Sequence, residues 1–457
     1  MAGRERESPA SAAAHSAGSG SPSERRVLLV NLDFRDFVYS HLWGRAVLDA
    51  CARRNRTVDV VTVNPFAGRN LAEELGVARS AVELPTRGEV IYVDAPDDTL
   101  YRSVIAHLLE RQRYDTLILN CDAPLFVYLM VERRLDFVRT RWLIYDRHLH
   151  IGLQTCAQDA RLRERVAASD LHLFTIQEIS TGAPPAPPTV APEYSPDNAV
   201  FGVGAPRDRT IDSENALVRF FKRLRKHDNA TVSKPSTVPE TSVVQQPQIL
   251  PDDTGIIRLL LGLGVRPENL HLQPWPLDEA FFAPRPATEL KDRFVIFSGG
   301  DSGRDYGTLF AAMSDLPIEL RLCANRYPQP LPPNVTLLPR LPLHRFRDEV
   351  AQAAAVVVPI TGHPPVSGIT VVAMAKMMGK PVIASDNEVV RMHISSSGHG
   401  GLLAEVGNVA SLRSLLTRVI QSPRECERLA WEGRAQASRD LSLRAFVERM
   451  LSCERHD

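Results

Sequence analysis

Short runs of apolar residues alternate with amphipathic stretches along the first third of the chain. The apolar runs predict strands at residues 25–33, 58–63, 89–94, 116–120, 142–145 and 171–176. Between them, apolar residues recur every three or four positions, which predicts helices at residues 40–55, 101–112, 125–133 and 155–169. Nearly continuous apolar strands separated by helices are typical of a parallel sheet covered on both faces. Residues 25–180 are therefore predicted to form an N-terminal Rossmann-like domain.

A second alternating series follows a passage that is interrupted by prolines. It predicts strands at residues 293–300, 318–323, 335–338, 356–358 and 381–384, helices at 306–313, 346–354 and 367–379, and a further strand and helix within 401–421. We divide this part of the chain into the end of the first domain with an interdomain linker (253–288), a C-terminal domain (289–430) and closing helices (431–457). The fold class is thus α/β, with two doubly wound parallel-sheet domains facing a cleft. Ligands of such sheets bind outside the carboxyl ends of the strands.

Two segments have a composition that does not favour a packed core. Residues 1–24 are rich in Ala, Ser, Gly and Arg and are predicted to be a disordered leader. Residues 181–252 are rich in proline and small polar residues and are predicted to be a largely disordered insertion. Within the insertion, residues 213–227 have the pattern of a basic amphipathic helix. Two interpretations stay open for it: peripheral contact with an anionic membrane or a partner, or a solvated helix packed on the domain.

The overall charge excludes some functions. The 457 residues include 54 basic and 54 acidic side chains, a balance that argues against a protein that coats nucleic acid. Six scattered cysteines without CxxC spacing favour reduced thiols. No apolar run is long enough to span a bilayer, and the leader lacks the apolar centre of a secretion signal. These features predict a cytoplasmic protein.

The stretch from residue 356 to 385 offers a phosphate site. It is a strand, a loop, a helix that starts near Ser367 and Gly368, and a second strand. We expect Ser367 to cap the helix, Gly368 to let a ligand approach the backbone, and the free amides through Ile369 and Thr370 to attract phosphate.

The second half of the chain resembles the donor domain of the retaining family-4 glycosyltransferases, which have the two-domain GT-B fold. The resemblance extends over about residues 255–422, and it rests on four segments of this sequence: VIFSGGDSGRDYGTLFAAM, NVTLLPRLPLHRFRDEVAQA, the stretch ending in GKPVIASD, and GHGGLLAEVGNVASL. It is thinner before residue 255, where LGLGVRPENLHLQPWPLDEAFFAP is similar to the family's interdomain passage and WLIYDRHLHIG to its acceptor-side strand and loop.

The resemblance implies a transferase that moves a sugar from a nucleotide-diphosphate donor, with a UDP or GDP nucleotide, to a glycan, lipid or small-molecule acceptor. No cofactor is implied beyond the nucleotide sugar. Gly299 and Gly300 would admit the pyrophosphate against the backbone, and Arg304 would supply positive charge to the leaving diphosphate. Leu341 falls where the family's backbone holds the base.

Two positions depart from the family's pattern. The family usually has two glutamates separated by seven residues, and counting back from Gly379 places Val366 and Met374 at their positions. Neither side chain can accept a hydrogen bond as a carboxylate does. The alternative to a transferase is therefore a non-catalytic protein of the same fold that binds nucleotide sugars. An epimerase of this fold is disfavoured because its paired carboxylates and histidine are not evident.

Polar residues of the loops supply the remaining candidates. Asp146 and His148 follow a predicted strand, and His363 lies in the loop before the donor helix. The resemblance gives Asp146 or His148 contacts with sugar or acceptor hydroxyls and gives His363 contact with the sugar, while plain loop packing remains the alternative for each. Retaining members need no dedicated protein base, so no catalytic residue is named. No DxD or clustered His/Asp spacing at a strand end predicts a metal site.

Overall fold

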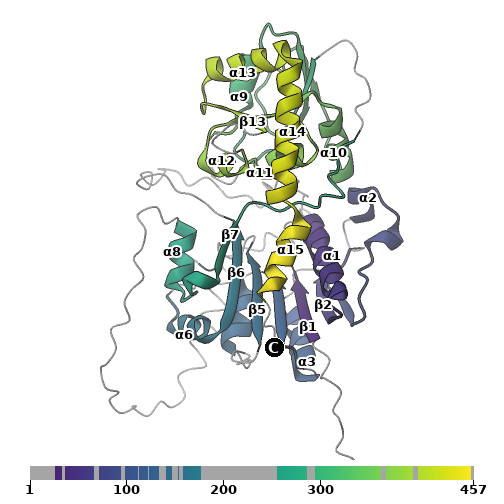
Figure 1. Ribbon diagram of the computed structural model, residues 1–457, viewed down its shortest axis with the longest axis vertical. Helices are drawn as coiled ribbons and strands as arrows, with labels where there is room; N and C mark the ends of the chain where they lie inside the picture. Colours follow the sequence, from purple (N-terminus) through teal and green to yellow (C-terminus); the bar gives the residue numbers. More distant parts are fainter. Residues whose placement is uncertain are drawn as a thin grey trace, which may run out of the picture.

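The computed structural model describes residues 26–32, 37–65, 71–93, 98–111, 113–121, 123–132, 140–146, 153, 158–176, 255–285, 294–361, 367–394 and 400–453. These residues form two α/β domains, which lie one above the other in Figure 1. The predicted leader and insertion, with its expected helix at 213–227, lie outside the described residues, as do His148, His363 and Val366.

Seven parallel strands form the sheet of the N-terminal domain, in the order β3-β2-β1-β4-β5-β6-β7. The strands are β1 (Arg26–Asn31), β2 (Thr57–Val63), β3 (Val90–Val93), β4 (Thr116–Asn120), β5 (Arg141–Asp146), β6 (Asp170–Ile176) and β7 (Leu270–Gln273). In the register of the central strands, Val27 lies opposite both Val58 and Thr116. The strand β7 comes after the insertion and pairs with β6, so the chain returns to this sheet before it leaves for the second domain.

Helices cover both faces of this sheet. They are α1 (Phe37–Arg53), α2 (Leu71–Leu75), α3 (Asp98–Arg111), α4 (Ala123–Val127), α6 (Ala160–Ala168) and α8 (Gly255–Gly262), with short helical turns at Arg79–Val82 and Pro267–Asn269 and a π-helical turn at Tyr128–Glu132. Alternate residues of each strand enter different cores: Val27 and Leu29 belong to one, Leu28 and Val30 to the other. The helix predicted from residue 155 begins only at Ala160, because the Asp159 side chain accepts hydrogen bonds from the amides of Arg161 and Leu162 and so caps the first turn.

Six parallel strands form the C-terminal sheet, in the order β10-β9-β8-β11-β12-β13. They are β8 (Phe294–Gly299), β9 (Ile318–Cys323), β10 (Val335–Leu337), β11 (Ala355–Val358), β12 (Val382–Ser385) and β13 (Gly401–Ala404). The helices around them are α9 (Tyr306–Met313), α10 (Leu343–Gln352), α11 (Ile369–Met377), α12 (Glu388–His393), α13 (Val409–Gln421) and α14 (Pro423–Asp440). The expectation of two parallel-sheet α/β domains is confirmed. The predicted boundary at residue 431 falls inside α14.

The last two helices bind the domains together. The long helix α14 packs on α11 of the C-terminal domain, and α15 (Leu443–Ser452) lies beside α1 on the N-terminal sheet (Figure 1). At the junction between them, the Leu277 amide donates to the Leu441 carbonyl over 2.8 Å and the Leu443 amide donates to the Leu277 carbonyl over 2.9 Å. A single cluster of buried side chains runs from the N-terminal sheet through Trp275 and Phe446 to α11. The domains therefore share one apolar core along this side.

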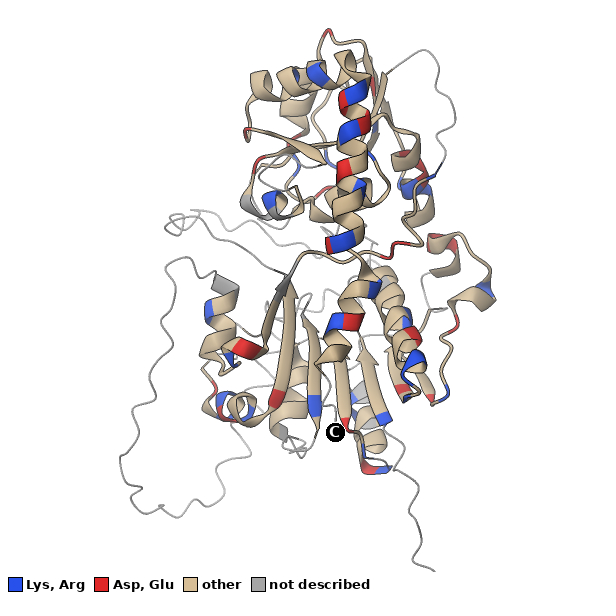
Figure 2. Cartoon of the chain, viewed as in Figure 1, with Lys and Arg blue, Asp and Glu red and all other residues tan. Residues whose placement is uncertain are grey.

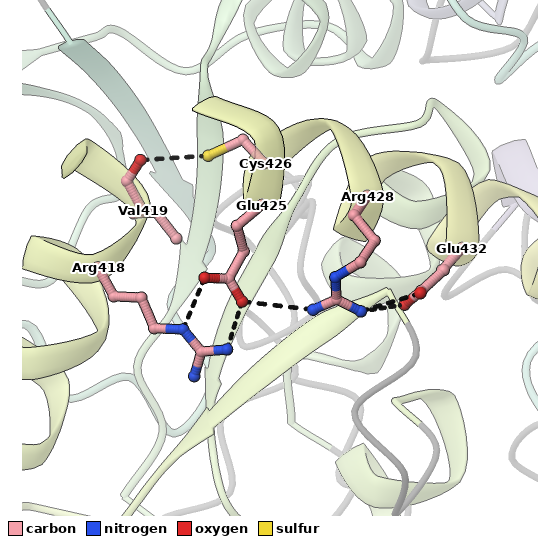
Figure 3. A network of polar contacts seen from close by, with 6 residues as sticks. All are labelled: Arg418, Val419, Glu425, Cys426, Arg428 and Glu432. Carbon is pink, nitrogen blue, oxygen red and sulfur yellow. Dashed lines mark hydrogen bonds and ion pairs between the residues drawn. The ribbon is translucent and has the colours of Figure 1, made fainter. Parts of the chain in front are cut away.

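Charged residues of both signs recur along α14 (Figure 2), and the buried positions of this helix are Leu429, Gly433 and Ala437. On α14 the Glu425 carboxylate accepts hydrogen bonds from Arg418 of α13 and from Arg428, and Arg428 also bonds to Glu432 at 2.8 Å (Figure 3). Because Arg418 and Arg428 are about half exposed, such surface pairs contribute little to stability. No helix in the described part of the chain combines the length and the apolar character that a membrane crossing requires. The five cysteines described here carry free thiols.

Candidate functional site

In the C-terminal sheet, the direction in which the chain adds strands reverses between β8 and β11. From β8 the chain winds outward through β9 and β10, then crosses back to β11 and winds the other way. The loops that follow β8 and β11 meet at this point: the Asp305 amide donates to the Pro359 carbonyl at 3.1 Å, and the Thr361 amide to the Gly303 carbonyl at 2.9 Å. Crevices at such reversals are where open α/β sheets bind their ligands.

Arg304 is the cation at this point. Its Nε donates to the Gly299 carbonyl over 3.1 Å and its Nη1 to the Ser302 carbonyl over 2.8 Å. The Nη2 atom is shielded from solvent and has no hydrogen-bond partner among the described residues. Burial lowers the pKa of the guanidinium from its ordinary value, and the Tyr306 hydroxyl and the Asp301 charge oppose that shift. A buried donor without a partner is costly, and an anion that accepted its hydrogen bond would remove that cost.

The nearest carboxylate does not neutralise Arg304 by a direct bond. Both oxygens of Asp301 are engaged by the next loop, which donates from the Asn325 amide at 2.6 Å, the Asn325 side chain at 2.7 Å and the Arg326 amide at 3.0 Å. Asp301 therefore fixes the loop that carries Arg304 and leaves the positive charge available.

Two glycines hold the guanidinium between them. Gly300 has φ +100°, and a Cβ placed on it would lie 2.7 Å from Arg304 Nη2. Gly368 has φ +84°, and its Cβ would lie 3.5 Å from Nη1 and 2.7 Å from a methyl group of Val358. Both backbone conformations and both close approaches favour glycine. Gly300 from the first loop and Gly368 from the start of α11 are thus brought together around one arginine.

Gly299 and Gly300, which the sequence predicts to face a pyrophosphate, instead contact other parts of the protein. The Gly300 amide already donates to the Cys323 carbonyl at 3.0 Å, and the Gly300 carbonyl accepts from the Tyr306 hydroxyl. The space that a Gly299 side chain would take is filled by the Phe346 ring, 2.6 Å from the Cβ position. These glycines make room for the protein's own Arg304 and Phe346. The pyrophosphate contact predicted for their backbone stays a prediction.

The expectation that Ser367 caps α11 is wrong. The residue at the N-cap is Gly368, and no side chain bonds to the amides of the first turn. Ser367 is directed instead to the β8 loop, where its Oγ lies 3.2 Å from Oγ of Ser302. The reason is the left-handed conformation of Gly368, which starts the helix one residue later than the serine pattern indicates. The first turn of α11, with Ile369 and Thr370, therefore keeps the uncapped amides and partial positive charge that attract anions.

Leu341 is connected to this site through Cys323. It lies just before α10, is partly buried and packs against the shared core. Burial raises the pKa of the Cys323 thiol to about 11, and a hydrogen bond with the Leu341 backbone partly offsets that rise. The Cys323 carbonyl also accepts a hydrogen bond from the Gly300 amide. Cys323 therefore contacts both Leu341 and the turn that positions Arg304.

Met374 lies inside the helix that begins at this site. All nine residues of α11 are buried, and Met374 is fully enclosed by the shared core. On the same helix Lys376 is also buried and donates to the His393 carbonyl and to the Gln436 side chain, and burial lowers its pKa to about 7. The position where the resemblance expects a carboxylate is thus an apolar packing position.

The N-terminal sheet has a corresponding reversal between β1 and β4, and the sequence analysis missed its polar residues. Asn120 Nδ2 donates to Asn31 Oδ1 at 2.8 Å and lies 3.1 Å from the Ser40 hydroxyl, while Asn31 Nδ2 donates to the Ser40 carbonyl at 2.8 Å. Nearby in α1, His41 is buried, its Nε2 has no partner among the described residues, and burial lowers its pKa to about 4. The sequence did contain a sign of these polar residues, because each of the two apolar strands ends in an asparagine.

Asp146 is the last residue of β5 and lies opposite Thr175 of β6. It therefore lies at the carboxyl end of the N-terminal sheet, on the strand next to β4, which borders the reversal. His148 and His363 are outside the described residues, so their predicted roles stay predictions. Among the residues that the structure describes, the one group of three side chains suited to holding a metal ion lies elsewhere, on β6, β7 and the end of α15.

No family model matches the sequence, and no curated protein does. Solved structures do match. A glycosyltransferase from Rickettsia africae aligns with a TM-score of 0.56 at 10% identity, covering 94% of this chain and 98% of that one. Anabaena HepE in complex with UDP-glucose aligns with a TM-score of 0.52 at 13% identity over 93% and 98% of the two chains. Sucrose-phosphate synthase from Thermosynechococcus elongatus aligns with a TM-score of 0.50 at 16% identity over 94% and 98%. At these identities the likeness establishes the fold, which is GT-B.

Proposed function

We propose that the protein is a glycosyltransferase that takes a sugar from a nucleotide-diphosphate donor. One observation carries the proposal: Arg304, at the chain reversal of the C-terminal sheet, presents a buried Nη2 that has no partner among the described residues. A diphosphate oxygen is the anion that best fits a planar guanidinium fork beside an uncapped helix start. HepE, whose structure shares this fold, was solved with UDP-glucose and with UDP, which supports a nucleotide-sugar donor.

In this proposal the C-terminal domain stabilises the leaving group. As the bond between the sugar and the diphosphate breaks, negative charge grows on the phosphate oxygens, and Arg304 together with the amides of Ile369 and Thr370 stabilises it. The acceptor hydroxyl forms the new bond on the face that the diphosphate leaves, which retains the configuration, and its proton passes to the leaving phosphate. The backbone at Leu341 holds the base, and UDP is the first nucleotide to test because it is bound in HepE.

The N-terminal domain would bind the acceptor. The reversal between β1 and β4 offers Asn31, Ser40 and His41, and Asp146 ends β5 at the same edge of the sheet. His148 and His363 complete the proposed set of sugar and acceptor contacts. A glycan, lipid or small-molecule acceptor, a cytoplasmic location and membrane contact through residues 213–227 are proposals that rest on the sequence.

A specific observation favours a second function, that of a non-catalytic protein that binds nucleotide sugars. Met374 is apolar and fully buried where the resemblance expects a carboxylate. A site that keeps the phosphate contacts but lacks that carboxylate can bind a donor without turning it over.

Thermal unfolding of the full-length protein with UDP, GDP or ADP tests the phosphate site, because a ligand that binds the native state raises the melting temperature. We expect one nucleotide to raise it, and Arg304→Ala to weaken that nucleotide's affinity roughly 100-fold, as the loss of about 3 kcal/mol from a charged donor implies. Arg424→Ala removes an exposed arginine from α14 and is the matched control. Binding unchanged in Arg304→Ala would reject the phosphate site.

Donor hydrolysis and transfer assays then separate the two functions. Release of UDP from UDP-sugar by the wild-type protein, lost in Arg304→Ala and kept in Arg424→Ala, supports a transferase. Binding without release across a broad acceptor panel supports the binding protein.

A further inference from the structure

Three metal-ligating side chains from distant parts of the sequence meet at the edge of the N-terminal sheet. His172 belongs to β6, His271 to β7, and Cys453 follows the last turn of α15. One ligand atom from each residue lies within 4.8 Å of the other two. The two histidines are in the first half of their strands, away from the carboxyl ends where the proposed sugar sites lie.

The packing of this corner directs the three side chains toward one another. The ring of His271 stacks between His172, at a centroid distance of 5.5 Å, and Phe174, at 4.4 Å. Phe446 of α15 meets Phe174 edge to face at 5.8 Å, which sets the helix over this part of the sheet. The helix therefore delivers Cys453 to the two imidazoles.

The spacing of the ligand atoms suits a tetrahedral ion. His172 Nδ1 lies 3.2 Å from His271 Nε2, and the Cys453 sulfur lies 3.9 Å from the same Nε2. With zinc–nitrogen bonds of about 2.0 Å and a zinc–sulfur bond of about 2.3 Å, tetrahedral angles separate two nitrogens by roughly 3.3 Å and a nitrogen and a sulfur by roughly 3.5 Å. The sulfur also lies within 4.8 Å of the ligand nitrogen of His172, so the cysteine side chain must move toward the imidazoles to complete the geometry.

A carboxylate supports one of the imidazoles from behind. Asp170 Oδ1 lies 3.6 Å from His172 Nε2, and Asp170 itself is held by Arg141 Nε at 2.8 Å. Metal-binding histidines commonly turn their second nitrogen to such a carboxylate, which fixes the proton on that nitrogen and leaves the other nitrogen free to bind. At 3.6 Å the Asp170 carboxylate lies beyond hydrogen-bond range, and its charge near Nε2 favours the tautomer that leaves the lone pair of Nδ1 in the cluster.

The three side chains are partly buried, and this burial shifts their pKa values. Burial lowers the pKa of His172 to about 4, with Arg141 adding to the shift and Asp170 opposing it, and burial also lowers the pKa of His271. Burial raises the pKa of the Cys453 thiol, so the sulfur becomes a strong ligand only when a cation displaces its proton.

We propose that His172, His271 and Cys453 bind one zinc ion, with water in the fourth position. Two imidazoles and a thiolate are borderline and soft donors, and such donors bind zinc in preference to magnesium or calcium. The ion would join the end of α15 to β6 and to the edge strand β7. Because α15 continues from α14 of the other domain, the site would fasten the closing helices to the N-terminal sheet.

Binding releases protons in a defined number. The Cys453 thiol loses one proton to the buffer as the zinc–sulfur bond forms. The proton that His271 Nε2 shares with His172 Nδ1 moves to Nδ1 of His271, so no second proton leaves. Calorimetric titrations in buffers of different ionisation enthalpy should therefore show one proton released per ion at neutral pH.

Cobalt(II) is the spectroscopic probe. Full-length protein freed of metal with a chelator is titrated with Co²⁺, and we expect one ion per chain, a thiolate-to-cobalt charge-transfer band and the intense visible bands of a tetrahedral ion, all abolished by added Zn²⁺. Cys453→Ser should remove the charge-transfer band and weaken binding at least 100-fold. Asp170→Asn should keep the spectrum and weaken binding roughly 10-fold.

The control is Cys426→Ser, which removes another partly buried thiol. The Cys426 sulfur bonds to the Val419 carbonyl where α13 meets α14, in the other domain from the cluster (Figure 3). We expect this variant to bind Co²⁺ as the wild type does. A cobalt spectrum that is unchanged by Cys453→Ser, or the absence of one bound ion per chain at micromolar metal, would overturn the proposal.

Discussion

Adding one methyl group at Gly300 tests whether the absence of a side chain at this position is needed for the placement of Arg304. The Gly300→Ala variant places a Cβ where the structure has Arg304 Nη2 at 2.7 Å, on a residue with φ +100°. Gly407→Ala is its matched control, because Gly407 also has a positive φ, +69°, but has no atom within 4 Å of the Cβ position. Both variants carry backbone strain, and only the first displaces a side chain.

The expected energies follow from the contacts. Strain of an L-residue in the left-handed region costs about 1–2 kcal/mol, which is the whole effect expected for Gly407→Ala. In Gly300→Ala the guanidinium must also move, and it loses its bonds to the carbonyls of Gly299 and Ser302. Each bond from a charged donor is worth about 1.5 kcal/mol or more. We therefore expect Gly300→Ala to be less stable than Gly407→Ala by about 3 kcal/mol.

Urea unfolding of both variants, followed by tryptophan fluorescence and far-UV circular dichroism, measures this difference. Titration of the same proteins with the nucleotide that stabilises the wild type adds a second reading. Gly300→Ala should lose roughly 100-fold in affinity, while Gly407→Ala keeps the wild-type value. Equal destabilisation of the two variants would show that the loop admits a side chain at Gly300 without moving Arg304, and the account of the site would then be wrong.

Two further variants test the helix that begins at the site. Met374→Glu should be less stable than the wild type by several kcal/mol and should gain no donor turnover, since it buries a carboxylate within a fully enclosed helix; a stable and more active variant would contradict this. Lys376 has a folded pKa of about 7, below its unfolded value of 10.5, so the unfolded chain binds more protons between these values and the free energy of unfolding should rise as the pH increases from about 7 to 10. Lys376→Met should flatten that rise, and identical pH profiles for the two proteins would refute the assignment.

The sequence was sufficient to predict the sheets because their central strands are buried on both faces. Central strands such as β4 and β11 are enclosed throughout, so their apolar runs are unbroken and easily read. Element ends were less predictable, because they depend on caps. Asp159 starts α6 five residues late, and Gly368 starts α11 after the serine that was expected to cap it.

Arg304 could be predicted from the sequence as the cation of the site, but the residues that surround it could not. Arg304 follows an apolar strand and a glycine turn, which is a local pattern. The contacts that matter join it to Gly368 and, through the loop pairing, to Pro359 and Thr361, more than 50 positions away in the chain. Only the strand order, with β8 beside β11, brings those segments together.

The same limit explains the cluster of His172, His271 and Cys453. The first two are 99 positions apart and the second and third 182, so no spacing motif contains them. They meet because β7 returns to the sheet after the insertion and α15 returns to it from the other domain. Both returns belong to the connectivity of the fold rather than to any local pattern. A search for metal sites in a chain of this architecture should therefore compare residues across β6, β7 and the final helix, where three separate passes of the chain converge.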